Sequence, residues 1–202
     1  MNEITALVNT FTAPITAPGD LVIVYGRVLD VNGEPLQGVS VEIWQTDARG
    51  VYDHPGFQGG GGTDPAFQYY GTSITDANGL YSFRTVKPGS EGIGRPPHIH
   101  VKVRVDGIDV LTTQFFFAED GDEQGADAIF RNAGPEVQNL ILQGEPVTGA
   151  DGVQVRVAAS ELVIDTGAGP GALALTPALT EGPFYPVVRL AGYDSDLAAV
   201  GG

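Results

Sequence analysis

The segment RPPHIHVKV, residues 95–103, holds two of the chain's three histidines, His98 and His100. Side chains two residues apart on a β-strand point to the same face, so the two imidazoles would lie side by side while Ile99 points the other way. Two adjacent imidazoles can bind one metal ion. The alternative is that both are solvated polar residues on an exposed strand face, and the neighbouring residues must decide.

A third candidate ligand is Tyr52, which follows the predicted strand of Trp44 in the segment DARGVYDHP. The chain leaves the sheet for a loop at this point, so the ring could instead pack at the edge of the fold. A phenolate is a hard anionic oxygen that suits a hard cation such as Fe(III), and coordination lowers the phenol pKa from about 10. With the two imidazoles, Tyr52 is compatible with an Fe(III) site.

A β-sheet is expected to position these residues. Segments with the alternating or apolar pattern of β-strands recur along the whole chain. Turn signals that place Gly beside Asn or Asp, such as VNGEPL, DANGL and VDGI, separate the runs. The pattern predicts an all-β fold, an antiparallel β-sandwich with few short helices and long loops. The predicted strands are residues 21–30, 39–47, 70–76, 80–86, 98–105, 109–117 and 153–164.

Helical patterns are scarce, and only residues 125–132 and 135–142 are predicted to form short helices at one edge of the sandwich. The Gly-rich segment 54–65 is too long for a hairpin turn and is typical of a loop that can cover a site. The run FFF at 115–117 lacks alternation. We therefore expect a strand that is covered on both faces or packed at an interface.

Length and composition limit the classes of partner. The 202 residues suit a single domain, and with no cysteine any metal must be bound by His, Tyr, Asp or Glu. A net charge of -15 with scattered Lys and Arg argues against nucleic acid and anionic membranes as partners. No basic leader and no apolar run of membrane-spanning length is present, so we expect a soluble, cytoplasmic protein.

At this point the sequence resembles a known family, the intradiol ring-cleavage dioxygenases of the protocatechuate 3,4-dioxygenase and catechol 1,2-dioxygenase type. The likeness runs in order through VYGRVLDVNGEPLQGVSVEIWQTDARGVYDH, DPAF, TDANGLYSFRTVKPG, GRPPHIH and LTTQFFFAEDG, about half of the chain. The resemblance implies a non-haem Fe(III) enzyme that uses O2 to cleave a catechol between its two hydroxyl-bearing carbons. The product would be a cis,cis-muconate-type diacid.

The resemblance also implies a role for each matching residue. Tyr52 would be the tyrosinate that stays on iron, with His98 and His100 as the imidazole ligands. Arg95 matches the arginine that stabilises negative charge on the substrate ring, and a fixed positive charge three residues before the first histidine agrees with that role. Gln114 matches a glutamine lining the same pocket. Arg95 could otherwise be a surface residue on a turn, and Gln114 a structural strand residue.

The first departure from the family pattern is a missing tyrosine. Relatives place a second tyrosine ligand shortly before the RPPHIH segment, whereas this chain reads KPGSEGIG there, with Glu91 or Gly92 at the position. Glu91 could replace it as a carboxylate ligand, water could fill the position, or Glu91 could be a solvated loop acid. Tyr69, Tyr70 and Tyr185 are other phenols that folding could bring near.

The second departure is the order of segments. TEGPFYP and the following DSDL resemble a stretch that precedes the first core strand in relatives, but here they lie at the carboxyl end. We therefore expect a circularly permuted single domain, with residues 20–165 as the core and 166–202 as a linker plus docking segment equivalent to the family's N-terminal arm. The segment would pack on its own chain or on a neighbouring subunit.

By the same resemblance, Pro183, Phe184 and Tyr185 are candidate walls of the substrate pocket. Their alternative interpretation is an aromatic tail that covers the edge of the sandwich. Because relatives are commonly oligomeric, we also expect a homo-oligomer. The sequence does not identify which catechol the pocket accepts.

Two further functions compete with the dioxygenase. The segments GRVLDVNGEPLQGVSVEIWQTD and TDANGLYSFRTVKPG also resemble carboxypeptidase regulatory-like modules, which are non-catalytic β-sandwiches. Such modules have no reason to combine HIH with Tyr52, Arg95 and Gln114. Alternatively, because one tyrosine is missing, the metal site has altered chemistry, such as hydrolysis or isomerisation.

Overall fold

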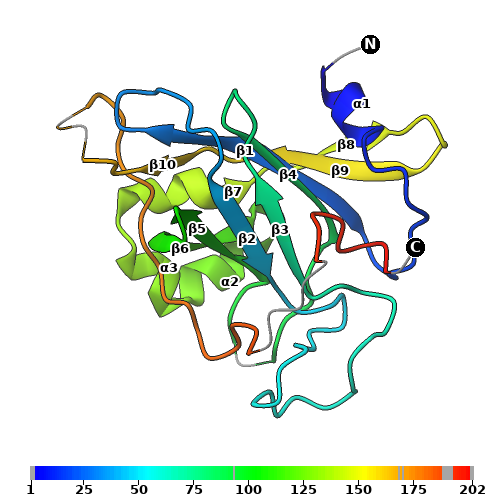
Figure 1. Ribbon diagram of the computed structural model, residues 1–202. Helices are drawn as coiled ribbons and strands as arrows, with labels where there is room; N and C mark the ends of the chain where they lie inside the picture. Colours follow the sequence, from blue (N-terminus) through cyan, green and yellow to red (C-terminus); the bar gives the residue numbers. More distant parts are fainter. Residues whose placement is uncertain (1–2, 93, 168, 170, 188–192, 201–202) are drawn as a thin grey trace.

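The computed structural model describes residues 3–92, 94–167, 169, 171–187 and 193–200, which form two stacked β-sheets. Figure 1 shows the short helices α2 (Gly121–Ala126) and α3 (Ala128–Asn132) at one edge and α1 (Glu3–Val8) on the other side, near β8. In the first sheet, the strand order is β10-β1-β9-β8, and β4 pairs with β1. The second sheet has the order β3-β2-β5-β6-β7. The strands of the first sheet are β1 (Leu21–Asp30), β4 (Leu80–Val86), β8 (Glu145–Thr148), β9 (Gln154–Ala159) and β10 (Leu162–Ile164). Those of the second are β2 (Ser40–Trp44), β3 (Tyr70–Ile74), β5 (His98–Val105), β6 (Ile108–Phe117) and β7 (Ile141–Leu142).

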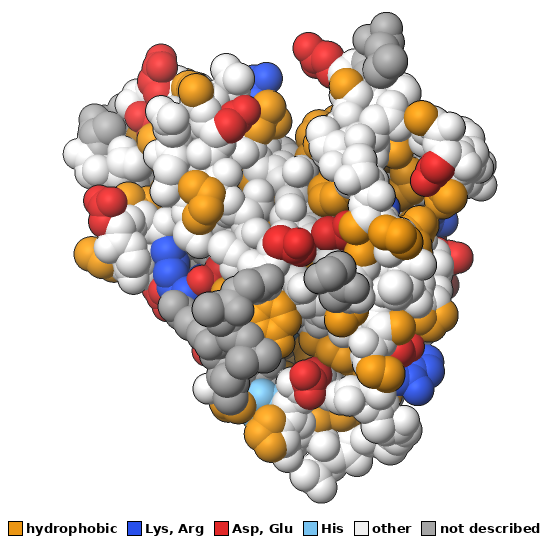
Figure 2. All heavy atoms as spheres, turned by 45° about the vertical axis from the view of Figure 1, so that its right-hand side comes forward, with side chains coloured by type: hydrophobic (Ala, Val, Ile, Leu, Met, Phe, Trp, Pro, Cys, Tyr) orange, Lys and Arg blue, Asp and Glu red, His pale blue; other side chains and the backbone are white. Residues whose placement is uncertain are grey.

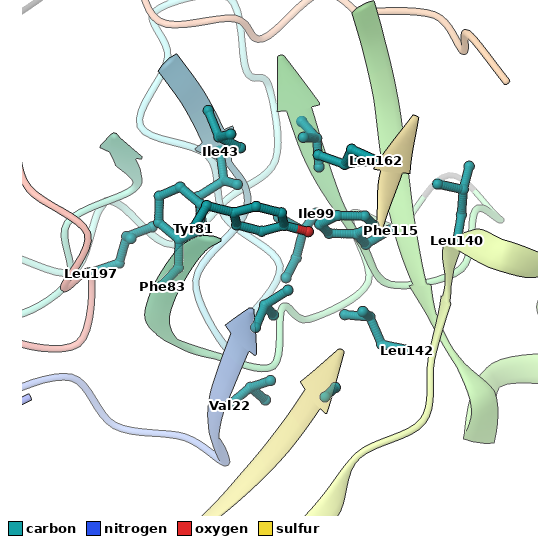
Figure 3. Close-up of a cluster of buried hydrophobic side chains, with 14 of the residues drawn as sticks. Val22, Ile43, Tyr81, Phe83, Ile99, Phe115, Leu140, Leu142, Leu162 and Leu197 are labelled. Atoms are coloured by element: carbon teal, nitrogen blue, oxygen red, sulfur yellow. The ribbon is translucent and has the colours of Figure 1, made fainter. Parts of the chain in front are cut away.

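The core lies between the two sheets (Figure 3). Ile99 of β5 and Phe115 of β6 enter it from the second sheet, and Phe83 of β4 enters it from the first. Tyr81 is also buried there, and its hydroxyl donates a hydrogen bond to the Ser160 carbonyl at 2.6 Å. The polar end of this large side chain is therefore satisfied inside the core.

The opposite face of β5 is polar but equally buried. Strand alternation turns His98, His100, Lys102 and Arg104 away from the core, and each is less than 9% exposed. Buried charged side chains are costly unless they are paired. Lys102 forms ion pairs with Asp109 and Glu181, and Arg104 forms ion pairs with Glu42 and Asp109.

The carboxyl-terminal segment supplies much of the cover over this polar face. Leu179 donates its backbone N–H to the carbonyl of Thr112 on β6 at 2.9 Å, and Glu181 reaches Lys102. Further along, Leu197 is fully buried, and Asp196 forms a buried ion pair with Arg84 at 2.5 Å. In this structure the segment packs on its own chain.

The predicted β-sandwich is confirmed, with mixed rather than purely antiparallel pairing. β1 pairs antiparallel with β4 but parallel with both β9 and β10. The predicted strand 153–164 is interrupted at residues 160–161, where the Ser160 N–H donates to the Tyr25 carbonyl at 2.9 Å. The predicted strand 39–47 ends early, at Trp44, because the chain turns there toward Tyr52.

Two helical predictions have different outcomes. Residues 125–132 fall in α2 (Gly121–Ala126) and α3 (Ala128–Asn132), as expected for a helical edge. The helix over 135–142 is wrong in type: η2 (Pro135–Leu140) is a 3-10 helix, and Ile141 and Leu142 pair with the end of β6. The sequence did not predict α1 (Glu3–Val8), η1 (Ala118–Asp120) or β8.

The FFF run is covered on both faces within the chain, as predicted. Phe115, Phe116 and Phe117 are at most 2% exposed, and Phe116 packs edge-on against Phe130 of α3 with ring centroids 5.0 Å apart.

Within the described ranges, the structure has no helix with the length and apolarity that a bilayer crossing requires.

Candidate active site

Three potential ligand atoms converge at the start of β5. The Tyr52 hydroxyl lies 3.0 Å from Nε2 of His100, and Nε2 of His98 lies 3.1 Å from the same His100 atom. All three side chains are at most 4% exposed. Nitrogen and oxygen lone pairs that face one another so closely need a proton or a cation between them. This donor set, two imidazoles and one phenol, fits a hard cation such as Fe(III).

Burial keeps the three groups neutral in the metal-free chain. Desolvation, reinforced by the positive charge of Arg95, lowers the pKa of His98 to about 4. Burial likewise lowers the pKa of His100, and burial followed by the Glu91 charge raises the pKa of Tyr52. Neutral imidazoles keep the lone pair that metal binding requires.

Strand register sets the surroundings of the histidines. His100 stands opposite Trp44 on β2 and Gln114 on β6, in one row across the sheet. The Trp44 ring stacks on the His100 imidazole at 4.8 Å with an interplanar angle of 6°. His98 is held by its other nitrogen, because Nδ1 donates to the Pro96 carbonyl at 2.8 Å. The sheet therefore positions His100, and the segment just before β5 holds the ring of His98.

Tyr52 lies on a loop that Asp47 organises. The Asp47 carboxylate accepts the backbone N–H groups of Arg49 and Val51 at 2.9 and 3.1 Å. Tyr69 adds a third hydrogen bond by donating its hydroxyl to the same carboxylate at 3.1 Å. Because the bend closes one residue before Tyr52, it sets the direction in which the phenol points.

Arg95 stands beside the ligand group and not on the surface. Its Nη1 lies 3.1 Å from Nε2 of His98, and its Nη2 donates to Oε1 of Gln114 at 2.7 Å. The same Nη2 lies 3.0 Å from the carboxylate of Asp127. Gln114 in turn donates to the Thr180 carbonyl at 2.8 Å. The structure thus brings Arg95 and Gln114 together at the histidines.

Glu91 lies close enough to the site to act on it electrostatically. Its charge raises the pKa of Tyr52, while its own pKa is raised chiefly by burial, with Arg95 acting in the opposite direction. The loop that carries Glu91 touches the Tyr52 loop so closely that a Cβ on Gly50 would lie 2.0 Å from the Ser90 carbonyl oxygen.

The other phenols are engaged elsewhere. Tyr69 binds Asp47, and Tyr70 accepts a hydrogen bond from Thr72 at 3.1 Å. The Tyr185 hydroxyl donates to Glu42 at 2.8 Å and accepts from Arg104 at 3.2 Å. These hydrogen bonds engage the three hydroxyls with partners other than the two histidines.

The carboxyl-terminal segment adds an aromatic border. Phe184 packs on Tyr52 with ring centroids 4.8 Å apart, whereas Tyr185 packs edge-on against Trp44 at 4.9 Å. Pro183 is exposed. Phe57, from the Gly-rich loop, packs against both Tyr52 and Phe184, with ring centroids 5.6 and 5.3 Å apart.

Sequence reasoning did not single out Asp127 or Phe57. Asp127 lies in a segment predicted as helix, and an acidic residue before an apolar helical run is a signal for an N-cap, not for a site. Within the described residues, no three His, Cys, Asp or Glu side chains gather into a metal-binding group. Tyrosine completes the present site, so only the combination with the imidazoles could have revealed it.

Two hollows in the surface lie away from these residues. They measure about 250 and about 970 Å³, and both are lined by residues of α1 and the first sheet. Neither is lined by Tyr52, His98 or His100. The convergence of ligand atoms, and not the size of a hollow, therefore marks the candidate active site.

The chain thus combines an all-β sandwich with a buried group of two histidines, a tyrosine and an arginine, and this combination can be compared with known proteins. The family model described as Dioxygenase matches residues 5–165, and the chain therefore belongs to the intradiol dioxygenase family. The match stops just before the carboxyl-terminal segment.

Curated relatives agree with this assignment. The chain is 40% identical over 109 residues to the protocatechuate 3,4-dioxygenase beta chain of Burkholderia cepacia, a match that covers 50% of this chain and 46% of that protein. It is 35% identical over 119 residues to catechol 1,2-dioxygenase of Acinetobacter baylyi, with coverage of 50% and 37%. The chain therefore spans less than half the length of either relative.

Solved structures resemble it over a larger share. The dioxygenase domain of a dioxygenase and carbohydrate-binding protein fusion from Streptomyces sp. SirexAA-E is 31% identical, with a TM-score of 0.58 over 74% of this chain and 82% of that one. Catechol 1,2-dioxygenase from Pseudomonas arvilla C-1 is 28% identical, with a TM-score of 0.57 over 83% of this chain and 60% of that one.

Proposed function

We propose that this protein is a non-haem Fe(III) dioxygenase that uses O2 to cleave a catechol between its two hydroxyl-bearing carbons, giving a cis,cis-muconate-type diacid. The observation that carries the proposal is the convergence on Nε2 of His100, which lies 3.0 Å from the Tyr52 hydroxyl and 3.1 Å from Nε2 of His98. Family membership supports the same reaction.

Tyr52, His98 and His100 would hold the iron. When bound, the metal supplies Lewis-acid polarisation of the catechol oxygens and the reaction with O2. Arg95 holds a positive charge beside His98 and stabilises negative charge that develops on the ring. Gln114 keeps the guanidinium in place by accepting from Nη2 at 2.7 Å.

Glu91 takes the place of the missing second tyrosine in this proposal, as a fourth ligand or as the acceptor of a catechol proton. Its raised pKa suits a group that gains and loses a proton during turnover. Its partial burial and its electrostatic effect on Tyr52 support this role more than that of a solvated loop acid.

The pocket for the catechol would be bordered by Pro183, Phe184 and Tyr185 of the carboxyl-terminal segment, with Phe57 packed against Phe184. Phe184 offers an aromatic face beside Tyr52, which suits a flat ring. Tyr185 acts indirectly, because it packs on the Trp44 ring that stacks on His100.

We also propose that residues 166–202 are the equivalent of the family's N-terminal arm, displaced by circular permutation from a core of residues 20–165. The family match ends at residue 165. The Ala198 carbonyl accepts the backbone N–H groups of Thr16 and Ala17 at 2.8 and 3.1 Å. Ala198 therefore lies beside the residues that lead into β1, where an N-terminal arm would join.

The two alternatives are less well supported. A non-catalytic sandwich module gains nothing from burying two imidazoles, a phenol and an arginine against one another, because such burial is costly without a ligand. Altered metal chemistry rests on the missing tyrosine ligand, and in this proposal Glu91 takes that position. A homo-oligomeric state and a cytoplasmic location stay predictions. Acidic side chains outnumber basic ones in the sequence, and Figure 2 shows them spread over one face.

The first experiment is a visible spectrum of the purified protein with metal analysis, before and after anaerobic addition of catechol. We expect a broad tyrosinate-to-Fe(III) band that shifts with catechol, followed by catechol-dependent oxygen uptake. Y52F should lose the band, whereas Y25F, on the first sheet, should keep it. A wild-type protein that stays colourless and metal-free after ferric and ferrous reconstitution would contradict the proposal.

A further inference from the structure

Asp127 is a buried carboxylate that the reaction described above does not use. It lies between α2 and α3, far along the chain from the ligand residues, and its side chain is 5% exposed. One carboxylate oxygen accepts from Arg95 through Nη2 at 3.0 Å and Nε at 3.4 Å. Two donors of one guanidinium thus meet one fixed anion, which restricts the plane of the guanidinium.

The other carboxylate oxygen fixes Asp127 itself. It accepts the backbone N–H of Ile129 at 3.0 Å and so caps the N-terminus of α3. The helix is fastened to the second sheet by Phe130, which packs on Phe116, and Phe116 stands opposite His98 in the strand register. Contacts therefore run without a break from α3 through the Asp127 carboxylate to Arg95, which lies beside His98.

The guanidinium of Arg95 needs a partner that fixes its orientation. Its side chain is 14% exposed and follows a loop, and an unrestrained guanidinium would turn toward solvent or toward Glu91. With Asp127 on one side and Gln114 on the other, Nη1 stays 3.1 Å from Nε2 of His98. The positive charge is thereby kept where a bound catecholate would meet it.

We propose that Asp127 is a positioning residue for the reaction, which aims Arg95 at the substrate through its ion pair while capping α3. The proposal rests on the dioxygenase function and on Arg95 acting on the ring. The hydrogen bonds of the carboxylate go to Arg95 and to the Ile129 N–H and not to a ligand residue. Its charge also raises the pKa of His98, and a loss of activity through Arg95 is distinguished from that direct effect by removing Arg95 as well.

The test compares wild type, D127N, R95Q and the double variant. Asparagine is as good an N-cap as aspartate, so D127N keeps the helix cap but removes the charge that orients Arg95. We expect D127N to lower kcat/KM for catechol by about 10- to 100-fold with iron content unchanged. In the R95Q background the same change should alter kcat/KM by less than about twofold, because the partner is already gone.

A second readout needs neither iron nor turnover. In the iron-free protein, we expect the side-chain Nε–H signal of Arg95 in NMR spectra to be sharp in wild type and broadened in D127N. D30N is the matched control, since Asp30 is a buried carboxylate that accepts backbone N–H groups of Asn32 and Glu34 in a turn after β1. It should leave both readouts unchanged. D127S, another capping residue, replaces D127N if the latter does not fold.

Three results would overturn the inference. The first is wild-type kcat/KM in D127N, even with a lower melting temperature. The second is an equal loss in both backgrounds, which would show a structural role only. The third is an unchanged Arg95 signal. If wild type itself takes up no oxygen with catechol, the dioxygenase function fails, and the Arg95 signal still decides whether Asp127 holds the arginine.

Discussion

The orientation of Tyr52 depends on hydrogen bonds made by its neighbours. Asp47 accepts two backbone N–H groups of the bend, and Tyr69 donates to it from the next strand region. Tyr69 also accepts the backbone N–H of Asp64 from the Gly-rich loop at 2.5 Å. The Tyr69 hydroxyl therefore connects the Tyr52 bend to the loop that carries Phe57, and the positions of both aromatic rings depend on this connection.

The dependence of the unfolding free energy on alkaline pH tests the role of the Tyr69 hydroxyl. Burial, with the nearby Asp47 charge, raises the pKa of Tyr69 to about 12, so the folded chain keeps a proton that the unfolded chain loses near pH 10. The unfolding free energy should therefore fall above pH 10, by about 1.4 kcal/mol per pH unit from Tyr69, until about pH 12.

The measurement is urea unfolding of the iron-free protein between pH 9 and 12, in wild type and Y69F. Y69F should show a shallower decline, with a constant loss at lower pH from the missing hydrogen bond. Tyr70 and Tyr81, whose pKa values burial also raises, maintain part of the decline in both proteins. Equal slopes would contradict the raised pKa.

Among the elements, two loops approach each other more closely than any side chain permits. A Cβ on Gly50 would lie 2.0 Å from the Ser90 carbonyl oxygen, and one on Gly89 would lie 2.5 Å from the Gly50 nitrogen. Gly50 also has a φ of 85°, which disfavours residues with a Cβ. This contact joins the loop of Tyr52 to the loop of Glu91.

Replacing Gly50 should therefore separate the two loops. We expect G50A to lower the unfolding free energy by more than about 3 kcal/mol and to abolish the tyrosinate band, because a backbone atom cannot move aside as a side chain can. G38A is the matched control: Gly38 has a φ of 76° but open space around it. It should lose only about 1 kcal/mol and keep its iron. Equal losses in the two variants, with iron retained, would show that the contact is dispensable.

On the scale of the whole molecule, the carboxyl-terminal segment completes both the fold and the proposed pocket. Leu197 lies so close to Gly71 that a Cβ on that glycine would be 2.5 Å from the Leu197 side chain. Asp196 forms an ion pair with the buried Arg84. Nearer the site, Thr180 accepts from Gln114, and Phe184 packs on Tyr52. The core of the fold and the site thus share one late segment.

A second permutation tests the proposed relation to the family's N-terminal arm. A chain with a Gly/Ser linker of about ten residues, which spans up to roughly 33 Å, would join Gly202 to Met1 and open between the exposed Thr166 and Gly167. We expect it to fold as a species of the same size, with the wild-type iron spectrum and kcat/KM within about threefold, because the segment's contacts are unaffected.

The control opens the chain between Asp106 and Gly107, in the hairpin that joins β5 to β6. This break separates the strands that carry the histidines and Gln114, so we expect loss of the iron band. A change in oligomer size for the first permutant would show that the segment packs on a neighbouring subunit in solution.

Local pattern alone predicted most of the strands and placed two candidate ligands on one face, whereas the role of each residue came from the resemblance to the family. Alternation placed His98 and His100 on one face of β5, because a strand repeats every two residues whatever its surroundings. Turn chemistry separated the strands in the same way. The apolar run at 115–117 indicated a strand covered on both faces, and Phe115 to Phe117 are buried. These features depend on neighbours in the sequence, so the sequence by itself determined them.

Contacts between distant residues required the tertiary structure. No spacing could show that Asp127 pairs with Arg95, that Thr180 holds Gln114 or that Phe57 meets Phe184. The parallel pairing of β1 with β9 and β10, and the 3-10 helix at Pro135–Leu140, were likewise decided by packing. Sequence periodicity reports which face of an element is buried but not what covers it, and the cover is what turns three potential ligands into a candidate active site.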